Sequence, residues 1–221
     1  MSSGTIADLD PARVRAVVFD FVGVLTQNPG GLVRDRAEQA GVPVQDVLPL
    51  LAGPVDEDTD HPWHRVERGE ITLAELDDLI DIVLRDAGIH APVRPPSPEE
   101  MQAHLRPIPE MAHAARLLRS AGYPTAIVTN NVREWGWWRS LVDADELVDV
   151  VVDSAHVGMR KPSAEIYELA ARRLDVSTDA CLMLDDFEWN VRGAQRAGMQ
   201  AMHITDPIAD SAAVLDLLLG S

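Results

Sequence analysis

The stretch Val17-Val-Phe-Asp-Phe-Val-Gly-Val-Leu-Thr26 places an aspartate and then a glycine directly after an apolar run. A short run of this kind is typical of a strand that is buried on both faces of a parallel sheet. Asp20 would end this strand, and Gly23 would permit a sharp turn after it. An aspartate at such a point can be a simple turn residue, but its carboxylate can also act as a nucleophile.

The later part of the chain repeats an alternation of strand and helix. Five short apolar runs predict strands, at Val14–Phe21, Thr125–Thr129, Leu147–Val152, Cys181–Leu184 and Gln200–Ile204. Helical patterns lie between the later runs, at Glu110–Ser120, Ala164–Leu174 and Asn190–Ala197. Gly122 and Gly198 follow two of these patterns, where glycine commonly ends a helix. The alternation predicts an α/β fold, a Rossmann-like parallel sheet flanked by helices.

The long gap between the first two strands predicts an inserted module. About a hundred residues separate these strands, which is far more than a simple crossover needs. Their pattern is helical: Leu32–Ala40 and Val44–Leu51 are amphipathic, and capping signals at Thr72–Glu75 and Ser97–Glu100 open two further helices. We therefore predict a helical cap over residues 27–105, inserted into a core made of residues 10–26 and 106–221.

Composition and charge exclude several classes of protein. The chain has 221 residues, of which 46% are hydrophobic and 25% charged, and its formal net charge is −17. This charge repels nucleic acid and anionic membranes, so we expect neither as a partner. No apolar run is long enough to cross a bilayer, and Met1–Pro11 lacks the features of a targeting segment, so we expect a cytoplasmic protein. The one cysteine, Cys181, lies in an apolar run and is expected to be a core residue.

Polar side chains follow or lie near four of the predicted strands. They are Asp20, the run Thr129–Asn131, the pair Arg160-Lys161 and the pair Asp185-Asp186. Parallel sheets bind their ligands outside the carboxyl ends of the strands, where these groups would meet. Two adjacent carboxylates repel each other unless a cation or water lies between them, and Mg²⁺ is the hard cation that prefers oxygen ligands. Each group also has an ordinary interpretation, as a turn, a solvated cation or an acidic helix start.

The same residues carry a resemblance to the haloacid dehalogenase superfamily. Four motifs occur in the order, spacing and strand context of that family: Val17–Thr26, Ile127-Val-Thr-Asn130, Lys161-Pro162 and Leu184-Asp-Asp186. Among its cap-bearing members, the chain resembles the N-terminal phosphatase domain of soluble epoxide hydrolase, through Trp63, Gly69-Glu-Ile-Thr72, Thr129-Asn-Asn131 and Asp185-Asp-Phe-Glu-Trp-Asn190. The resemblance implies a hydrolase that transfers phosphoryl groups beneath a helical cap.

The resemblance also implies a role for each motif. Asp20 would be the nucleophile and would form an aspartyl-phosphate, which splits hydrolysis into two easier steps. The hydroxyl of Thr129 and the backbone amide of Asn130 would bind the phosphoryl oxygens. Lys161 would neutralise the nucleophile and the transferred group, because phosphoryl transfer depends mainly on positioning and charge. Arg160, beside it, is the less favoured cation.

The implied cofactor is Mg²⁺. At one position of its site, Val22, the chain departs from the family pattern. The ligands would be Asp20, Asp186 and the backbone carbonyl of Val22, with Asp185 acting through water or by holding Lys161. Phosphatases of the superfamily usually carry a second aspartate where this chain has Val22. A valine keeps the carbonyl but cannot transfer a proton, and loss of a general acid–base group typically costs about 10²–10⁴-fold in rate.

These observations favour a Mg²⁺-dependent phosphatase that acts on a small phosphorylated metabolite. Because of Val22, two alternatives stay open. The first is a catalytically impaired protein that binds a phosphorylated ligand or a protein partner without turnover. The second is a phosphotransferase that passes the phosphoryl group to an acceptor other than water.

Two aromatic clusters have less specific interpretations. The cluster His61, Trp63, His64 and Arg65 in the insert could select the leaving group of the substrate, although packing is the more ordinary role. Trp135, Trp137 and Trp138 could form the patch of a homodimer or close over the active site, and here too packing is the simpler interpretation.

Overall fold

The computed structural model describes residues 4–91 and 93–220 and contains one parallel sheet of five strands. The strands are β1 (Ala16–Phe19), β2 (Thr125–Thr129), β3 (Val150–Asp153), β4 (Cys181–Asp185) and β5 (Gln200–His203). Their order across the sheet is β3-β2-β1-β4-β5, which places β1 at the centre. Phe19, the last residue of β1, lies opposite Ile127 of β2 and Leu184 of β4, so β2 extends two residues and β4 one residue beyond the end of β1.

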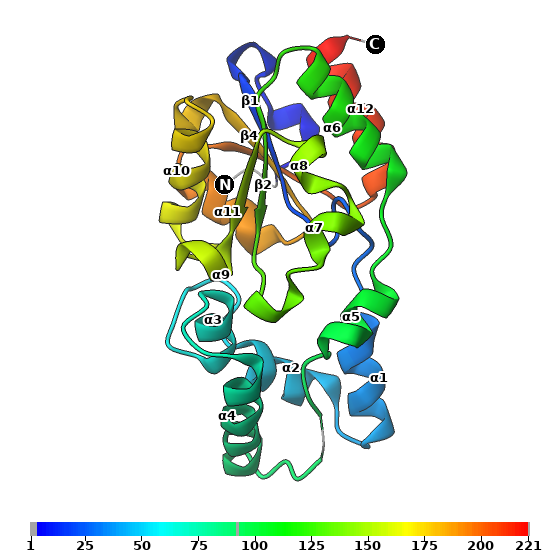
Figure 1. Cartoon of the computed structure of the whole chain (residues 1–221), viewed down its shortest axis with the longest axis vertical. Coiled ribbons are helices and arrows are strands. Elements are labelled where there is room, and N and C mark those ends of the chain that lie inside the picture. Colours follow the sequence, from blue (N-terminus) through cyan, green and yellow to red (C-terminus); the bar gives the residue numbers. More distant parts are fainter. Residues whose placement is uncertain (1–3, 92, 221) are drawn as a thin grey trace.

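The core helices cover both faces of this sheet (Figure 1). They are α6 (Pro109–Ser120), α7 (Trp138–Leu141), α8 (Ala144–Leu147), α9 (Ser154–Val157), α10 (Ala164–Arg173), α11 (Glu188–Arg196) and α12 (Pro207–Leu219). Alternate residues of each strand point to opposite faces. Thus Val17 and Phe19 pack in the cluster that contains Met111 of α6, whereas Val18 packs with Ile166 of α10. The predicted Rossmann-like fold is confirmed.

A helical cap lies beyond the carboxyl ends of the strands, at the lower end of Figure 1. Its helices are α1 (Gly31–Gln39), α2 (Val44–Ala52), α3 (Pro62–Glu67), α4 (Leu73–Asp86) and α5 (Pro98–His104). Both predicted capping boxes form: Thr72 Oγ1 accepts a hydrogen bond from Glu75 N at 3.2 Å, and Ser97 Oγ accepts one from Glu100 N at 3.3 Å. The division at residues 26/27 and 105/106 stays a prediction.

The structure corrects one predicted strand and adds elements that the pattern did not predict. The run Leu147–Val152 is not all strand, because Leu147 ends α8 and β3 begins only at Val150. Apolar residues in a helix end and in the following strand look alike in sequence when both are buried. The long helix α12 was also not predicted, although Asp206 caps it by accepting hydrogen bonds from Ile208 N and Ala209 N.

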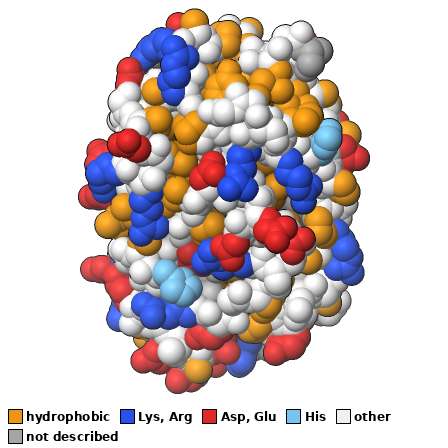
Figure 2. Space-filling model, turned by 45° about the horizontal axis from the view of Figure 1, so that its top comes forward, with side chains coloured by type: hydrophobic (Ala, Val, Ile, Leu, Met, Phe, Trp, Pro, Cys, Tyr) orange, Lys and Arg blue, Asp and Glu red, His pale blue; other side chains and the backbone are white. Residues whose placement is uncertain are grey.

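The surface charges and the position of the single cysteine agree with the predictions made from the composition. On the face drawn in Figure 2, basic side chains are scattered among acidic ones and do not gather into one patch. Within the described residues, no helix combines the length and the apolar character that crossing a bilayer requires. Cys181 is fully buried in the core, and this burial raises the pKa of its thiol to about 12. A thiol in that state is a packing residue and not a nucleophile.

Candidate active site

The ends of β1 and β4 each supply an aspartate, and the loop before α10 supplies a lysine that lies between them in one buried row. Lys161 Nζ lies 2.7 Å from Asp20 Oδ1 and 2.7 Å from Asp185 Oδ2. Lys161 is the only lysine of the chain, and its side chain is 1% exposed. A compact ammonium fits between two carboxylates where the planar fork of an arginine would not. The predicted residues Asp20, Lys161 and Asp185 therefore meet in space.

The charges in this row shift one another's pKa. Burial raises the pKa of Asp20 well above its usual range, and the carboxylates of Asp185 and Asp186 add to this effect while Lys161 opposes it. Burial alone would lower the pKa of Lys161, but the carboxylates of Asp185 and Asp20 outweigh it and raise that pKa. The ammonium group thus stays charged at neutral pH. It can hold the negative charge of a phosphoryl group beside the Asp20 carboxylate.

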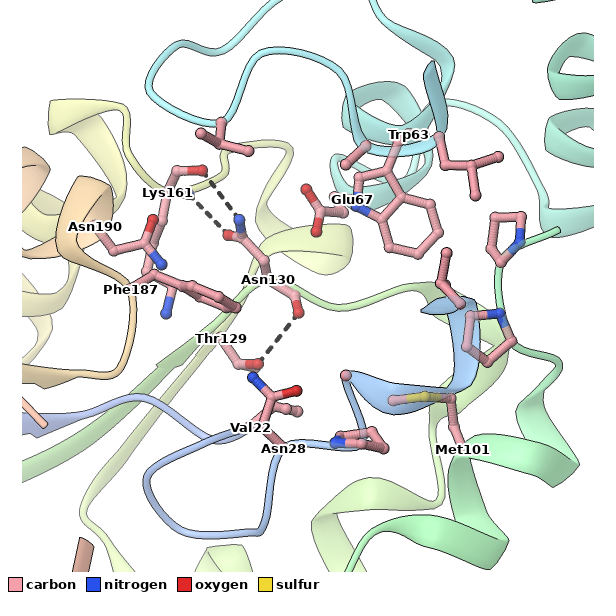
Figure 3. Close-up of a pocket in the computed structure, with 18 of the residues that line it drawn as sticks. Val22, Asn28, Trp63, Glu67, Met101, Thr129, Asn130, Lys161, Phe187 and Asn190 are labelled. Atoms are coloured by element: carbon pink, nitrogen blue, oxygen red, sulfur yellow. Dashed lines mark hydrogen bonds between the residues drawn. The ribbon is translucent and has the colours of Figure 1, made fainter. Parts of the chain in front are cut away.

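Asn130 fixes the segment that carries the lysine. Its side-chain Oδ1 accepts a hydrogen bond from Lys161 N at 2.8 Å, and its Nδ2 donates one to Lys161 O at 3.0 Å. The side chain is therefore already used, which leaves the backbone amide as the group that could contact a phosphoryl oxygen. Thr129, the last residue of β2, lines the same pocket through a buried side chain. Figure 3 shows Thr129, Asn130 and Lys161 close together at one end of this pocket.

Three carboxylates at the strand ends match the ligand set of a hard cation. Oxygen atoms of Asp20, Asp185 and Asp186 all lie within 4.8 Å of one another. Asp186 Oδ1 is buried and has no hydrogen-bond partner, so one oxygen is ready for a metal ion. Asp185 is less available, because Oδ2 accepts from Lys161 Nζ while Oδ1 accepts from Phe187 N and Asn190 Nδ2. These contacts agree with the second of the two roles predicted for Asp185, which is to hold Lys161 in place.

Local electrostatics and backbone shape also suit a cation at this point. Burial raises the pKa of Asp186 to about 6, and the nearby charge of Asp185 contributes to the rise. A divalent ion would relieve this repulsion. Gly23 has a φ of +91°, and a Cβ added there would lie 2.1 Å from Asp186 Oδ2. The turn after β1 therefore needs glycine both for its conformation and for the space beside this carboxylate.

The pocket above these residues has a volume of about 320 Å³ and an apolar roof. Its polar end contains Asp20, Thr129, Asn130 and Lys161, and Val22 lines it with an apolar side chain. Most of the remaining lining is hydrophobic and comes from the cap, from the segment after β2 and from the segment after β4 (Figure 3). These apolar residues are Leu32, Val33, Leu48, Leu51, Ala52, Val55, Trp63, Pro95, Pro96, Met101, Trp135, Phe187 and Trp189.

One buried ion pair interrupts this apolar roof. Glu67, at the end of α3, lies with its Oε2 2.7 Å from Arg160 Nε, and both side chains are more than nine-tenths buried. Arg160 NH1 also donates a hydrogen bond to Glu57 O at 3.1 Å. Ser154 Oγ of α9 donates to Glu67 O at 2.6 Å. The cap is thus tied to the core along α3, and Arg160 is a cap-binding residue beside Lys161.

The two aromatic clusters mainly pack. His64 is fully buried, with Nδ1 accepting from Thr59 N at 3.0 Å and Nε2 lying 3.0 Å from Ala52 O. His61 caps α3 by accepting from Trp63 N. Trp138 is buried and donates from Nε1 to Asp153 Oδ2 at 3.1 Å. Only Trp63 and Trp135 of the two clusters line the pocket, with ring centroids 6.4 Å apart.

Two polar residues of the site were not predicted from the sequence. Asn28 donates from Nδ2 to Asp186 Oδ2 at 2.9 Å and so holds a candidate metal ligand. Glu67 lines the pocket from the cap. No sequence motif pointed to Asn28. Glu67 stands two residues before Gly69-Glu-Ile-Thr72, a segment already singled out by the resemblance.

A family model for haloacid dehalogenase-like hydrolases matches residues 14–198 of the chain. A sesquiterpene phosphatase from Aspergillus oryzae is 30% identical over 197 residues, covering 88% of this chain and 92% of that protein. Bifunctional epoxide hydrolase 2 from Rattus norvegicus is 26% identical over 207 residues, covering 87% of this chain but 37% of that protein. Another matched relative is longer still, and the match spans 19% of its length.

Solved structures share this fold. An enzyme of the haloacid dehalogenase family from Bacteroides thetaiotaomicron, solved with magnesium and inorganic phosphate, superimposes with a TM-score of 0.61. The superposition covers 87% of this chain and 94% of that one, at 18% sequence identity. At this identity the likeness concerns the fold alone.

Proposed function

The chain belongs to the haloacid dehalogenase-like hydrolase family, and from this we propose that it is a Mg²⁺-dependent phosphatase of a phosphate monoester with an apolar leaving group. The observation that carries the proposal is the row Asp20, Lys161 and Asp185, with 2.7 Å between each carboxylate and the ammonium. A buried nucleophile beside a fixed cation has the chemistry that phosphoryl transfer needs.

The proposed reaction runs in two steps at Asp20. A carboxylate oxygen of Asp20 attacks phosphorus, the bond from phosphorus to the leaving oxygen breaks, and an aspartyl-phosphate forms. Water then attacks phosphorus, the bond to Asp20 breaks, and inorganic phosphate leaves with the carboxylate restored. Lys161 keeps its proton and holds the charge of the phosphoryl oxygens, while Thr129 and the Asn130 amide orient them.

Asp20, Asp186 and the backbone carbonyl of Val22 would hold the magnesium ion, with Asp185 positioning Lys161. When bound, such an ion neutralises the charge that develops on the phosphoryl oxygens. The buried, unpartnered oxygen of Asp186 supports this assignment. Asn28 would keep the Asp186 carboxylate in place from outside, through its 2.9 Å hydrogen bond.

The apolar roof supports the substrate class. A sugar phosphate would leave its hydroxyl groups against Leu51, Met101 and the indole rings without hydrogen-bond partners, at a cost of about 1–3 kcal/mol for each buried group. A hydrocarbon chain would instead gain roughly 25 cal/mol for each Å² of surface removed from water. The match to a sesquiterpene phosphatase supports the same class. The alternative hypothesis is a protein that binds its ligand without turnover, and it is favoured by Val22, which cannot transfer a proton.

The test is phosphate release from a series of alkyl and isoprenoid monophosphates and from sugar phosphates, with and without Mg²⁺. We expect turnover that is selective for the apolar substrates. In Asp20→Asn it falls by at least about 10⁴-fold, because the nucleophile is lost. Asp35→Asn, which removes an exposed carboxylate of α1, is the matched control and should behave like the wild type. If the wild type binds these phosphates without releasing phosphate, the result would favour the alternative hypothesis of a binding protein without turnover.

A further inference from the structure

Position 22 leaves a specific gap in the proposed chemistry. The leaving oxygen needs a proton when its bond to phosphorus breaks, and the attacking water must lose one in the second step. Val22 can do neither. His64 is buried in the cap and His61 is used to cap α3, and neither lines the pocket, while Lys161 keeps its proton between two carboxylates. Among the described residues that line the pocket, the carboxylates are Asp20 and Glu67.

Glu67 lies on the side of the pocket where the proton is needed. In phosphoryl transfer the attacking and leaving oxygens stand roughly in line with phosphorus. Asp20 attacks from the strand ends, so the leaving oxygen, and later the water, face the cap. Figure 3 shows Glu67 on the cap side of the pocket, between Trp63 and Asn130. Its side chain is more than nine-tenths buried, yet it borders the same pocket as Asp20.

The surrounding contacts hold Glu67 rigidly. Its backbone carbonyl accepts a hydrogen bond from Ser154 Oγ at 2.6 Å, and its Oε2 lies 2.7 Å from Arg160 Nε. Gly69, two residues later, approaches the core so closely that a Cβ there would lie 2.2 Å from Ala155 O. Because both its backbone and its side chain are held, the carboxyl group of Glu67 can move little, and proton transfer requires such fixed positioning.

The charges around Glu67 permit both protonation states. Burial raises its pKa, while Arg160, the Trp63 indole and the more distant Lys161 oppose the rise without cancelling it. The charge of Arg160 is shared, because Asp58 Oδ1 lies 3.8 Å from its NH1. Glu67 is therefore less firmly held in its ionised form than a carboxylate with an arginine of its own.

We propose that Glu67 of the cap is the acid–base group that position 22 lacks. In the first step its carboxyl gives a proton to the leaving oxygen as the bond to phosphorus breaks. The resulting carboxylate takes a proton from the water that attacks the aspartyl-phosphate, and the electron pair of the broken bond returns to Asp20. Each turnover thus returns Glu67 to its protonated form. This inference rests on the proposed phosphatase function.

The test compares leaving groups in Glu67→Gln, which keeps the size of the side chain. Octyl phosphate needs a proton on its leaving oxygen, whereas p-nitrophenyl phosphate releases a stable anion. We expect kcat/KM for octyl phosphate to fall by about 10²-fold or more and that for p-nitrophenyl phosphate to change little. The aspartyl-phosphate should accumulate, visible as a mass increase after acid quenching, because water is no longer activated. Glu70→Gln, an exposed cap carboxylate outside the pocket, is the matched control.

Two further variants separate catalysis from folding. In the Val22→Asp background the new carboxylate should replace the acid–base function, so adding Glu67→Gln should change octyl phosphate activity little, whereas a packing role of Glu67 would lower it in both backgrounds. Glu67→Asp keeps a carboxyl group at this position but withdraws it by one methylene, so it should lose activity toward octyl phosphate more than toward p-nitrophenyl phosphate. Equal changes for both substrates in Glu67→Gln and Glu67→Asp would overturn the inference. If Asp20→Asn still abolished turnover, the phosphatase function would stand without it.

Discussion

The two ends of the pocket are built from opposite kinds of contact. At the strand ends, Asp20, Lys161 and Asp185 form a buried row of charges joined at 2.7 Å. Under the cap, the wall is hydrophobic except for the ion pair between Glu67 and Arg160. A charged row can stabilise one kind of reaction, whereas an apolar wall only distinguishes shapes and polarity. We infer from this difference that the charged row carries out the attack on phosphorus, whereas the cap selects the substrate and, through Glu67, supplies the proposed proton transfer.

The largest effect should come from breaking the charged row. In Lys161→Met the carboxylates of Asp20 and Asp185 lose the ammonium group between them, and we expect activity to fall by about 10³-fold. The free energy of unfolding should fall by about 3–5 kcal/mol, because two buried charges lose their partner. Phosphate release and urea unfolding measure the two losses. Arg116→Met, at an exposed site on α6, should change neither, and an unchanged stability in Lys161→Met would contradict the buried ion pair.

A smaller and more selective effect should follow from a charge in the apolar wall. Leu48 lines the pocket yet is 44% exposed, so Leu48→Lys should fold normally. We expect kcat/KM for long alkyl phosphates to fall by about 10–100-fold and that for a short phosphate ester to stay constant. Ile82→Lys is the matched control, because Ile82 is a similarly exposed apolar residue of α4 outside the pocket. An equal loss of kcat/KM for long and short substrates would contradict a role of the apolar wall in substrate selection.

The smallest effect should concern the stability of the cap in mild acid. Burial lowers the pKa of His64 to about 4, and the charge of Arg160 contributes. The unfolded chain, with a histidine pKa of about 6.5, then binds protons more readily, so stability is lost as the pH falls from about 6.5 towards 4. The loss should reach about 3 kcal/mol at most. Urea unfolding at several pH values should show a flatter profile in His64→Gln than in the wild type, and parallel profiles would contradict this role.

Much of the fold could be predicted because its signals are local. The apolar runs of β2 and β4, and the helix starts at Thr72 and Ser97, depend on neighbours within a few residues. The boundary of β3 could not be predicted in the same way, because Leu147 and Val150 are both apolar and partly or fully buried. The family was also predicted correctly, since its motifs keep their order and spacing along the chain.

Other parts of the site depend on residues that are far apart in sequence. Asn28 reaches Asp186 across 158 positions, and Arg160 reaches Glu67 across 93. Neither pair has a spacing that a pattern could reveal, because the cap must first fold onto the core. The same holds for the apolar wall, whose residues come from the cap helices and from the turns after β2 and β4.

Residue patterns along the chain were enough to predict the strand and helix order, the family and the polar residues at the strand ends, because each of these follows from local patterns and chain order. The folded chain was needed to show that Lys161 lies between two carboxylates, that Asp186 has a buried oxygen without a hydrogen-bond partner, and that Glu67 lines the pocket from the cap. These features arise when distant segments pack together, since burial and close approach set the charges and contacts that individual residues acquire.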